Sequence, residues 1–165
     1  MSARNTRVVF DCNVYAQALI NEVSPAGRCY ALARSGDMIL FVSAYVLEEI
    51  VELHLKLPAR YGVTLDDCHA LLNEIQTFAQ LIESPSECFV HPLDPDDSPY
   101  VNLAIQANAE LIISRDKHLL GLTDSTKPWS QEFRDRFSHI HILTPEELLT
   151  ERARPTQGKS ANASN

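Results

Sequence analysis

Short apolar runs of strand length alternate with helical patterns along most of this chain, and this alternation most constrains its fold. Runs of four to eight β-branched or aromatic residues between turn signals are typical of buried strands, whereas apolar residues three and four positions apart indicate helices. We predict strands at residues 7–10, 38–42, 88–90, 111–114 and 139–143. Strands separated by helices favour a sandwich with a mainly parallel sheet and right-handed crossovers, so the pattern predicts an α/β fold.

Capping residues mark where the predicted helices begin. Ser24-Pro25, Ser43 and Thr144-Pro145 each place a hydroxyl side chain before a helical segment, and Thr64 precedes a longer one. The predicted helices span residues 14–20, 25–35, 44–57, 64–82 and 99–105, with a last one from residue 145.

The chain has 165 residues, of which 45% are apolar, and this is enough for one core and too little for two. We expect one domain over residues 1–151. Residues 152–165 have Ala as their only apolar type, so we expect a flexible C-terminal tail there.

We expect a cytoplasmic protein without a membrane partner. No apolar run approaches the roughly 20 residues of a membrane span, and the N-terminal residues lead directly into the first predicted strand rather than into a signal-peptide core. The four cysteines are far apart and form no C-x-x-C pair, which favours reduced thiols and disfavours a structural zinc site.

The net charge of −8 argues against binding of nucleic acid through a broad basic surface, because Lys and Arg supply most of the non-specific affinity for phosphates. Divalent cations bound in an acidic pocket can supply positive charge locally. Alternatively, the acidic balance only keeps the protein in solution. With five glycines and no glycine-rich loop, the chain lacks the G-x-G-x-x-G and Walker-type nucleotide sites.

Three aspartates follow or precede elements that meet at one edge of the predicted sheet. Ligands of open α/β sheets bind outside the carboxyl ends of the strands. Asp11 follows the first strand, and Asp116 follows the strand at 111–114. Asp97 lies at the loop-to-helix junction before that strand's helix, so the three carboxylates can converge.

The helix after residue 43 offers a fourth acid. On a helical wheel, Glu49 lies closer to the margin of the apolar face than Glu48 or Glu52, so we prefer Glu49. Taken singly, each aspartate also resembles an ordinary helix cap and Glu49 a solvated charge. Together, converging carboxylates need a compensating cation. Their hard oxygens suit Mg²⁺ or Mn²⁺, which would support metal-assisted phosphodiester hydrolysis.

Four segments of the chain resemble, in their usual order, the acidic motifs of the PIN-domain family. They are V-V-F-D-C-N-V at residues 8–14, Ser43 with Glu49, D-P-D-D at 94–97, and I-I-S-R-D-K-H-L-L at 112–120. The resemblance covers about residues 7–150 and implies an α/β/α sandwich and divalent-metal-dependent ribonuclease activity. It is closest to the toxin components of toxin-antitoxin systems, and so it also implies a small antitoxin partner and a homodimer.

The resemblance also assigns roles to individual residues. Those that would hold the metal are Asp11, Glu49, Asp97 and Asp116, and those that would orient the water or the acids are Asn13 and Ser114. Two departures stand out: Cys12 occupies a position that is commonly Thr or Ser, and Ser114-Arg115 replaces a common Thr-Gly. Arg115 either contacts a phosphate, obstructs one, or is a plain surface arginine.

Three alternatives stay open. A phosphatase-like or receiver-like domain also uses strand-end aspartates with Mg²⁺, but the phosphatases usually have a second Asp two residues after the first, where this chain has Asn13. A non-catalytic module with the same fold would bind RNA or a protein without cutting. His139 and His141 share one side of a predicted strand and can bind metal, but without a third ligand nearby we favour structural or exposed histidines.

Overall fold

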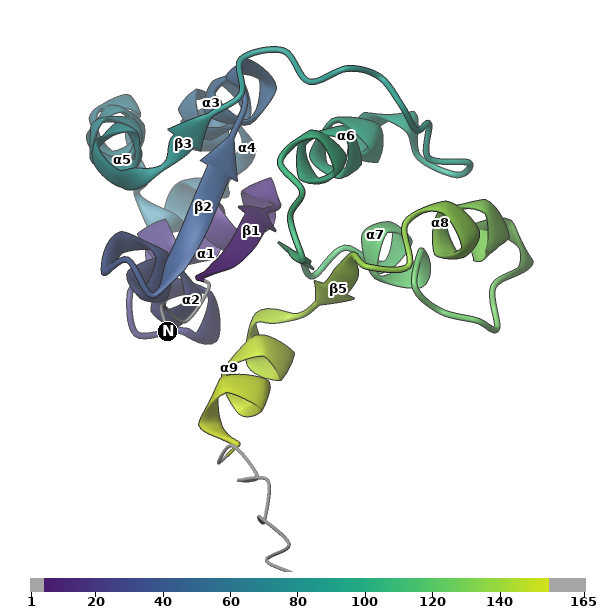
Figure 1. The fold of residues 1–165 in the computed structure, drawn as a ribbon. Coiled ribbons are helices and arrows are strands. Elements are labelled where there is room, and N and C mark those ends of the chain that lie inside the picture. Colours follow the sequence, from purple (N-terminus) through teal and green to yellow (C-terminus); the bar gives the residue numbers. More distant parts are fainter. Residues whose placement is uncertain (1–4, 155–165) are drawn as a thin grey trace, which may run out of the picture.

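A computed structural model describes residues 5–154 and contains one parallel five-stranded sheet (Figure 1). The strand order is β3-β2-β1-β4-β5, and every pair of neighbours is parallel. The strands are β1 (Thr6–Phe10), β2 (Met38–Val42), β3 (Gln80–Leu81), β4 (Leu111–Ile113) and β5 (His141–Leu143). Helices pack around this sheet, so the predicted α/β/α sandwich with a mainly parallel sheet is confirmed.

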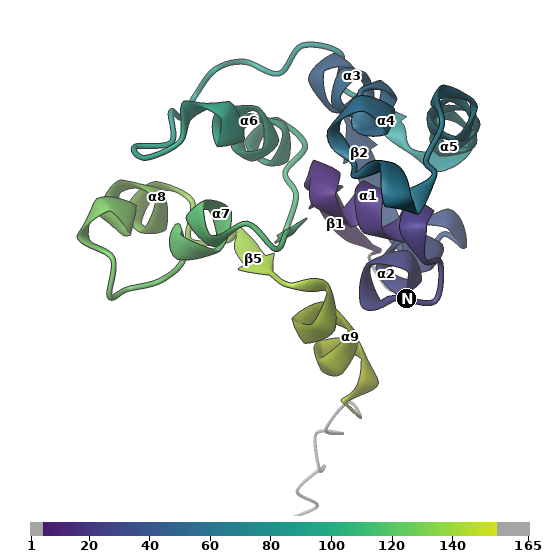
Figure 2. The same ribbon diagram turned by 180° about the vertical axis from the view of Figure 1, so that it is seen from behind.

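The helices fall into groups beside the two halves of the sheet. In both ribbon views α3, α4 and α5 lie beside β2 and β3, whereas α7 and α8 lie on the side of β5 (Figures 1 and 2), and α6 packs against β1, β4 and β2 between them. The helices of the described residues are α1 (Cys12–Ile20), α2 (Pro25–Arg34), α3 (Ala44–Val51), α4 (Leu53–Lys56), α5 (Leu65–Phe78), α6 (Ser98–Gln106), α7 (Lys117–Gly121), α8 (Gln131–Arg136) and α9 (Pro145–Ala153). Three 3-10 turns, η1 (Ala59–Tyr61), η2 (Pro95–Asp97) and η3 (Pro128–Ser130), complete the list.

The predicted capping residues start their helices. The Ser24 hydroxyl accepts a hydrogen bond from the backbone N–H of Gly27, and the Ser43 hydroxyl accepts one from Val46. Thr64 and Thr144 each form a reciprocal capping box with the acid three residues later. These bonds satisfy N–H groups that have no partner inside the helix, which fixes where each helix begins.

The core is centred on β1. Val8, Val9 and Phe10 are fully buried, because β2 and β4 flank the strand and helices cover it. Strands covered on both faces are apolar throughout rather than alternating, which is the pattern of residues 8–10. The central position of β1 gives the residue that follows it, Asp11, a rigid support.

The predicted strand at residues 88–90 is wrong. The side-chain oxygen of Asn102 on α6 accepts hydrogen bonds from the backbone N–H groups of Cys88 and Phe89, and its amide donates to the Phe89 carbonyl. The segment thus obtains from one side chain the hydrogen bonds that a neighbouring strand would supply. Its apolar character reflects the packing of Phe89 against Phe133 and Phe137.

The helix predicted for residues 64–82 ends earlier, and a short strand follows it. Helix α5 stops at Phe78, and β3 pairs with the end of β2 through Phe41 and Val42. Gln80 and Leu81 are both exposed at the edge of the sheet. Two exposed residues carry no alternating pattern, so the strand has no signature in the sequence.

Helix α9 extends to Ala153, and residues 155–165 of the expected tail lie outside the described residues. Between residues 5 and 154 there is no helix with the length and apolar character needed to cross a membrane.

Gly27 tests the close packing of α2 against the segment that precedes it. A Cβ atom at this position would lie 2.3 Å from the backbone oxygen of Glu22, which cannot move aside as a side chain would. We expect Gly27→Ala to lower the free energy of unfolding by about 1 to 3 kcal/mol in urea titrations, despite the better helix propensity of Ala. Asn73→Ala, at an exposed position of α5, should leave the free energy of unfolding unchanged or raise it. Equal effects of the two substitutions would show that the contact between Gly27 and Glu22 is not the cause.

Candidate metal site

Asp11 is held at the carboxyl end of β1. Its backbone N–H donates to the carbonyl of Ile113 at the end of β4, 3.0 Å away, so it lies where the two central strands end. The side chain is 7% exposed. One carboxylate oxygen accepts from the backbone N–H of Cys12 (2.6 Å), and the other accepts from the Asn13 amide (3.0 Å) and the Ser114 hydroxyl (2.6 Å).

These surroundings act on the pKa of Asp11 in opposite directions. Burial raises its pKa, the hydrogen bonds from Ser114 and Cys12 lower it, and the charges of Asp116 and Glu49 raise it again, with a net rise above the ordinary value. A cation at this position would oppose the rise in the pKa of Asp11, because a positive charge favours the ionised carboxylate.

Asp97 ends the η2 turn before α6 and is 9% exposed. Its Oδ2 atom is buried and has no hydrogen-bond partner. Burial, followed by the charges of Asp116, Asp94 and Asp11, raises the pKa of Asp97 to about 7. A buried carboxylate oxygen without a donor is unfavourable unless something absent from the protein chain, such as a cation, completes it.

Asp116 is the N-cap of α7 and lies beside Asp11. One of its oxygens accepts from the backbone N–H groups of His118 (2.7 Å) and Leu119 (3.3 Å). Its own backbone N–H donates to the Ser114 hydroxyl, 2.9 Å away. The same buried hydroxyl donates to the Asp11 carboxylate, so Ser114 joins Asp116 to Asp11. Asp116 is thus a helix cap and a neighbour of the other acids at once.

Glu49 lies within electrostatic range of the aspartates. Its side chain is 25% exposed, against 52% for Glu52, which agrees with the expected position at the margin of the apolar face. Its charge raises the pKa values of Asp11 and Cys12. Lys56 lies 2.9 Å from both Glu49 and Glu52, so a lysine neutralises Glu49 when no metal is bound.

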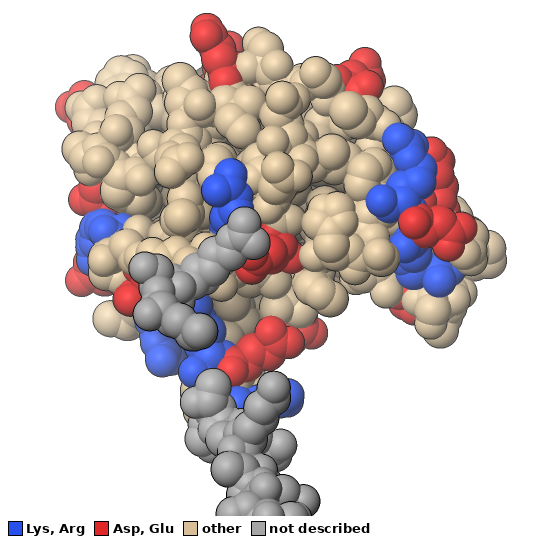
Figure 3. All heavy atoms as spheres, viewed as in Figure 1, with Lys and Arg blue, Asp and Glu red and all other residues tan. Residues whose placement is uncertain are grey.

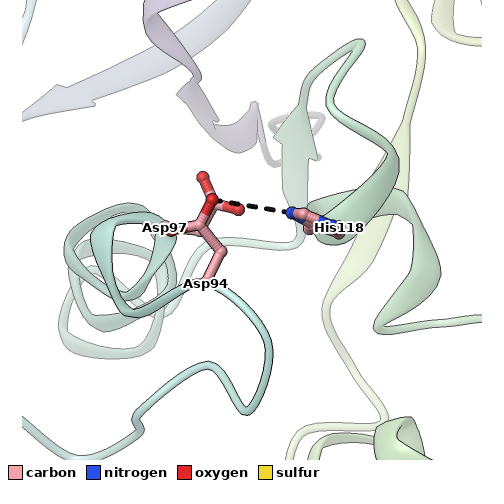
Figure 4. A group of neighbouring side chains, drawn as sticks. All are labelled: Asp94, Asp97 and His118. Carbon is pink, nitrogen blue, oxygen red and sulfur yellow. Dashed lines mark ion pairs between the residues drawn. The ribbon is translucent and has the colours of Figure 1, made fainter.

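Within residues 5–154, one group of three side chains has potential ligand atoms that all lie within 4.8 Å of one another, and it consists of Asp94, Asp97 and His118 (Figure 4). Asp97 was predicted from the sequence, whereas Asp94 and His118 were missed as ligands. Both lie inside the motifs that carry the resemblance, one turn or less from a predicted acid. The four predicted acids influence one another electrostatically, but no three of them approach as closely as this group.

His91 holds together the two segments that carry this group, and the sequence analysis missed it. It is 1% exposed, and its Nδ1 accepts from the backbone N–H groups of Leu93 and Asp94, each at 3.1 Å. Its Nε2 donates to the His118 carbonyl at 2.9 Å. Because Nδ1 accepts two hydrogen bonds, the ring proton of His91 lies on Nε2. By contrast, His139 and His141 are exposed.

Arg115 is tied to helices rather than free at the surface. Its guanidinium donates to Gln17 on α1 and pairs with Glu146 on α9. The Arg115 guanidinium, which the sequence analysis considered as a phosphate ligand, is therefore already engaged by these two side chains. Cys12 is partly buried, and its pKa is raised to about 12 by burial and by the charges of Glu49 and Asp11, so its thiol stays protonated.

The raised pKa of Asp97 predicts how its replacement changes stability. The native carboxyl holds its proton up to about pH 7, whereas the unfolded one loses it near pH 4, so its ionisation destabilises the fold progressively as the pH rises between these values. We expect Asp97→Asn to raise the free energy of unfolding by about 1 to 2 kcal/mol at pH 8 in EDTA, and by less at pH 5.

The measurement is urea unfolding at both pH values. Glu87→Gln, which replaces an exposed acid, is the control and should change stability by less than about 0.5 kcal/mol at either pH. A loss of stability on replacing Asp97 at pH 8 would contradict the assignment of a strained carboxylate.

Comparisons with known proteins agree with this arrangement. Over 147 residues the chain is 29% identical to uncharacterized protein MJ1680 of Methanocaldococcus jannaschii, and the alignment covers 88% of this chain and 90% of that protein. The family model of the PIN domain matches residues 7–118, which include β1 from Arg7 onward, all of β2, β3 and β4, and the acids Asp11, Glu49, Asp94, Asp97 and Asp116. The chain therefore belongs to the PIN-domain family.

Proposed function

We propose that this protein is a divalent-metal-dependent ribonuclease that hydrolyses RNA phosphodiester bonds. One observation carries the proposal: Asp97 presents a buried, unpartnered carboxylate oxygen among acids whose charges raise the pKa of one another. Such a group is compensated by a cation, and hard oxygen ligands suit Mg²⁺ or Mn²⁺. Membership of the PIN-domain family supports nuclease chemistry, because its members are generally metal-dependent nucleases.

The charge distribution supports a role for the metal in binding RNA. The net charge is −8, and on the face drawn in Figure 3 the basic side chains form separate patches interrupted by acidic ones. A surface of this kind has little affinity for phosphates by itself. A bound cation supplies the positive charge at the place where the chemistry requires it.

The residues have distinct tasks in this proposal. Those that hold the cation are Asp11, Glu49, Asp97 and Asp116. When bound, the cation supplies an activated water and neutralises charge on the phosphate. Ser114 and Asn13 fix the Asp11 carboxylate by hydrogen bonds, and Ser114 also fixes the start of α7. Glu49 pairs with Lys56, so this ion pair must break before the Glu49 carboxylate can bind a metal.

Replacing Asp11 tests the enzymatic assignment. We expect Asp11→Asn to reduce Mn²⁺-dependent cleavage of single-stranded RNA by about 100-fold or more, because it weakens a metal ligand while the Asn side chain can retain much of the hydrogen-bond network. The assay follows cleavage of a labelled RNA by purified protein with Mn²⁺, Mg²⁺ or EDTA, and Glu87→Gln should cleave like the unaltered protein.

Unchanged cleavage in Asp11→Asn, or cleavage that persists in EDTA, would refute this mechanism. RNA binding without cleavage would favour the non-catalytic module, and hydrolysis of a phosphate monoester but not of RNA would favour the phosphatase-like alternative.

We also propose that the protein acts in the cytoplasm as the toxin of a toxin-antitoxin pair, as a homodimer with a small antitoxin partner. This part rests on the resemblance of its motifs to such toxins. Expression of the chain alone should arrest growth of the host, and Asp11→Asn should not. Growth curves after induction measure this, with co-expression of the product of a short neighbouring gene as the rescue. Normal growth with an active nuclease would remove the toxin assignment and leave the enzymatic one.

A further inference from the structure

We propose that Asp94, Asp97 and His118 form a second cation subsite, which shares Asp97 with the four-acid site and binds a divalent transition metal such as Mn²⁺ in preference to Mg²⁺. The inference rests on the proposed function for its biological meaning and deepens it by naming the metal that the site selects. His118 would contribute a ring nitrogen, whereas the four acids of the first set offer only oxygens.

The three side chains are close to the spacing of metal ligands. Their nearest potential ligand atoms lie within 4.8 Å of one another, and ligands on opposite sides of an ion held at about 2.1 Å are about 4.2 Å apart. Asp94 and His118 are partly exposed, with 37% and 33% of their side-chain surfaces accessible, so small rotations can close the difference. Figure 4 shows the two acids near the His118 ring, which comes from a different element, with the dashed line marking the ion pair between His118 and Asp94.

The unpartnered oxygen of Asp97 is an independent indication of a ligand. Oδ2 of this buried side chain has no donor within hydrogen-bond distance. The remaining charge pair of the group does not supply one, since the 3.5 Å ion pair joins His118 to Asp94 rather than to Asp97. An ion pair between two partly exposed side chains also contributes little to stability. A cation held by all three residues accounts for both features.

The backbone holds the ligand-bearing residues in place. The His118 carbonyl accepts from His91, and its N–H donates to Asp116, so its position is fixed relative to both sides of the site. The same His91 ring accepts from the N–H of Asp94. One buried imidazole thus supports two of the three ligands, as the outer groups of metal sites commonly do.

The nitrogen donor decides which metal fits. Mg²⁺ prefers oxygen ligands in near-ideal octahedral geometry, whereas imidazole nitrogen suits the divalent transition metals, whose affinities for mixed nitrogen and oxygen sites rise from Mn²⁺ onward. Mn²⁺ also accepts the carboxylates that make up the rest of the group. Replacing His118 should therefore affect Mn²⁺ binding more than Mg²⁺ binding.

Metal titrations of the purified full chain, freed of metal with EDTA, test the subsite without any measurement of activity. Isothermal titration calorimetry and electron paramagnetic resonance would count the bound Mn²⁺ ions and give their dissociation constants. We expect His118→Gln and Asp94→Asn each to weaken one class of Mn²⁺ site by about tenfold or more and Mg²⁺ binding by less than about threefold. His141→Gln, which replaces an exposed histidine on β5, should bind both metals like the unaltered chain.

A second readout reports which histidine lies near the bound ion. Substoichiometric Mn²⁺ should broaden the ring proton signals of His118 before those of His141 in the nuclear magnetic resonance spectrum of the unaltered chain. Circular dichroism melts establish that the variants are folded. Mn²⁺ affinity that is unchanged in His118→Gln, or that falls equally with Mg²⁺ affinity, would overturn the proposal even if the protein cleaves RNA. Conversely, selective loss of Mn²⁺ binding in a chain that cuts no RNA would leave the subsite standing and remove the proposed function.

Discussion

The hydroxyl of Ser114 joins the two strands from which the acidic site is built. It donates to the Asp11 carboxylate and accepts from the backbone N–H of Asp116, so the ends of β1 and β4 and the start of α7 share one buried side chain. The charge of Asp116 raises the pKa of Asp11, and the hydrogen bond from Ser114 lowers it. Because the N–H of Asp11 also bonds to Ile113, the acids are held by the same backbone contacts that pair the two central strands.

The free energy gained by burying the apolar core offsets the cost of burying carboxylates at the site. The fully buried residues of β1 supply apolar burial of about 1.5 to 3 kcal/mol for each large side chain. Asp11 and Asp97 oppose it, since burial raises the pKa of both and Asp97 has an oxygen without a donor. Strain of this kind is expected where a fold is organised for a ligand rather than for maximal stability.

Some parts of this site follow from the sequence, and others depend on tertiary contacts. Asp11 and Asp116 follow apolar runs that only parallel strands explain, so the rule that strand ends share an edge was sufficient to place them together. Asn102 could not be foreseen, because it replaces a strand partner of Phe89 from 13 residues away, and this turned an apparent strand into a loop. His91 has no local signature either, since its three bonds form only when the chain has folded.

The capping interpretation of the acids is confirmed for Asp11 and Asp116, whose side chains accept hydrogen bonds at the starts of α1 and α7, whereas metal binding by the acids stays a prediction. Asp116 caps α7 with one oxygen, and this bond positions the first turn of the helix, which carries His118. Asp94 likewise accepts a hydrogen bond at the start of η2, which ends in Asp97. In each case the cap directs the backbone so that the next polar side chain meets its neighbours across the site. A carboxylate that organises a helix start therefore also sets the position of the polar side chain that follows it, and with it the spacing of the acidic cluster.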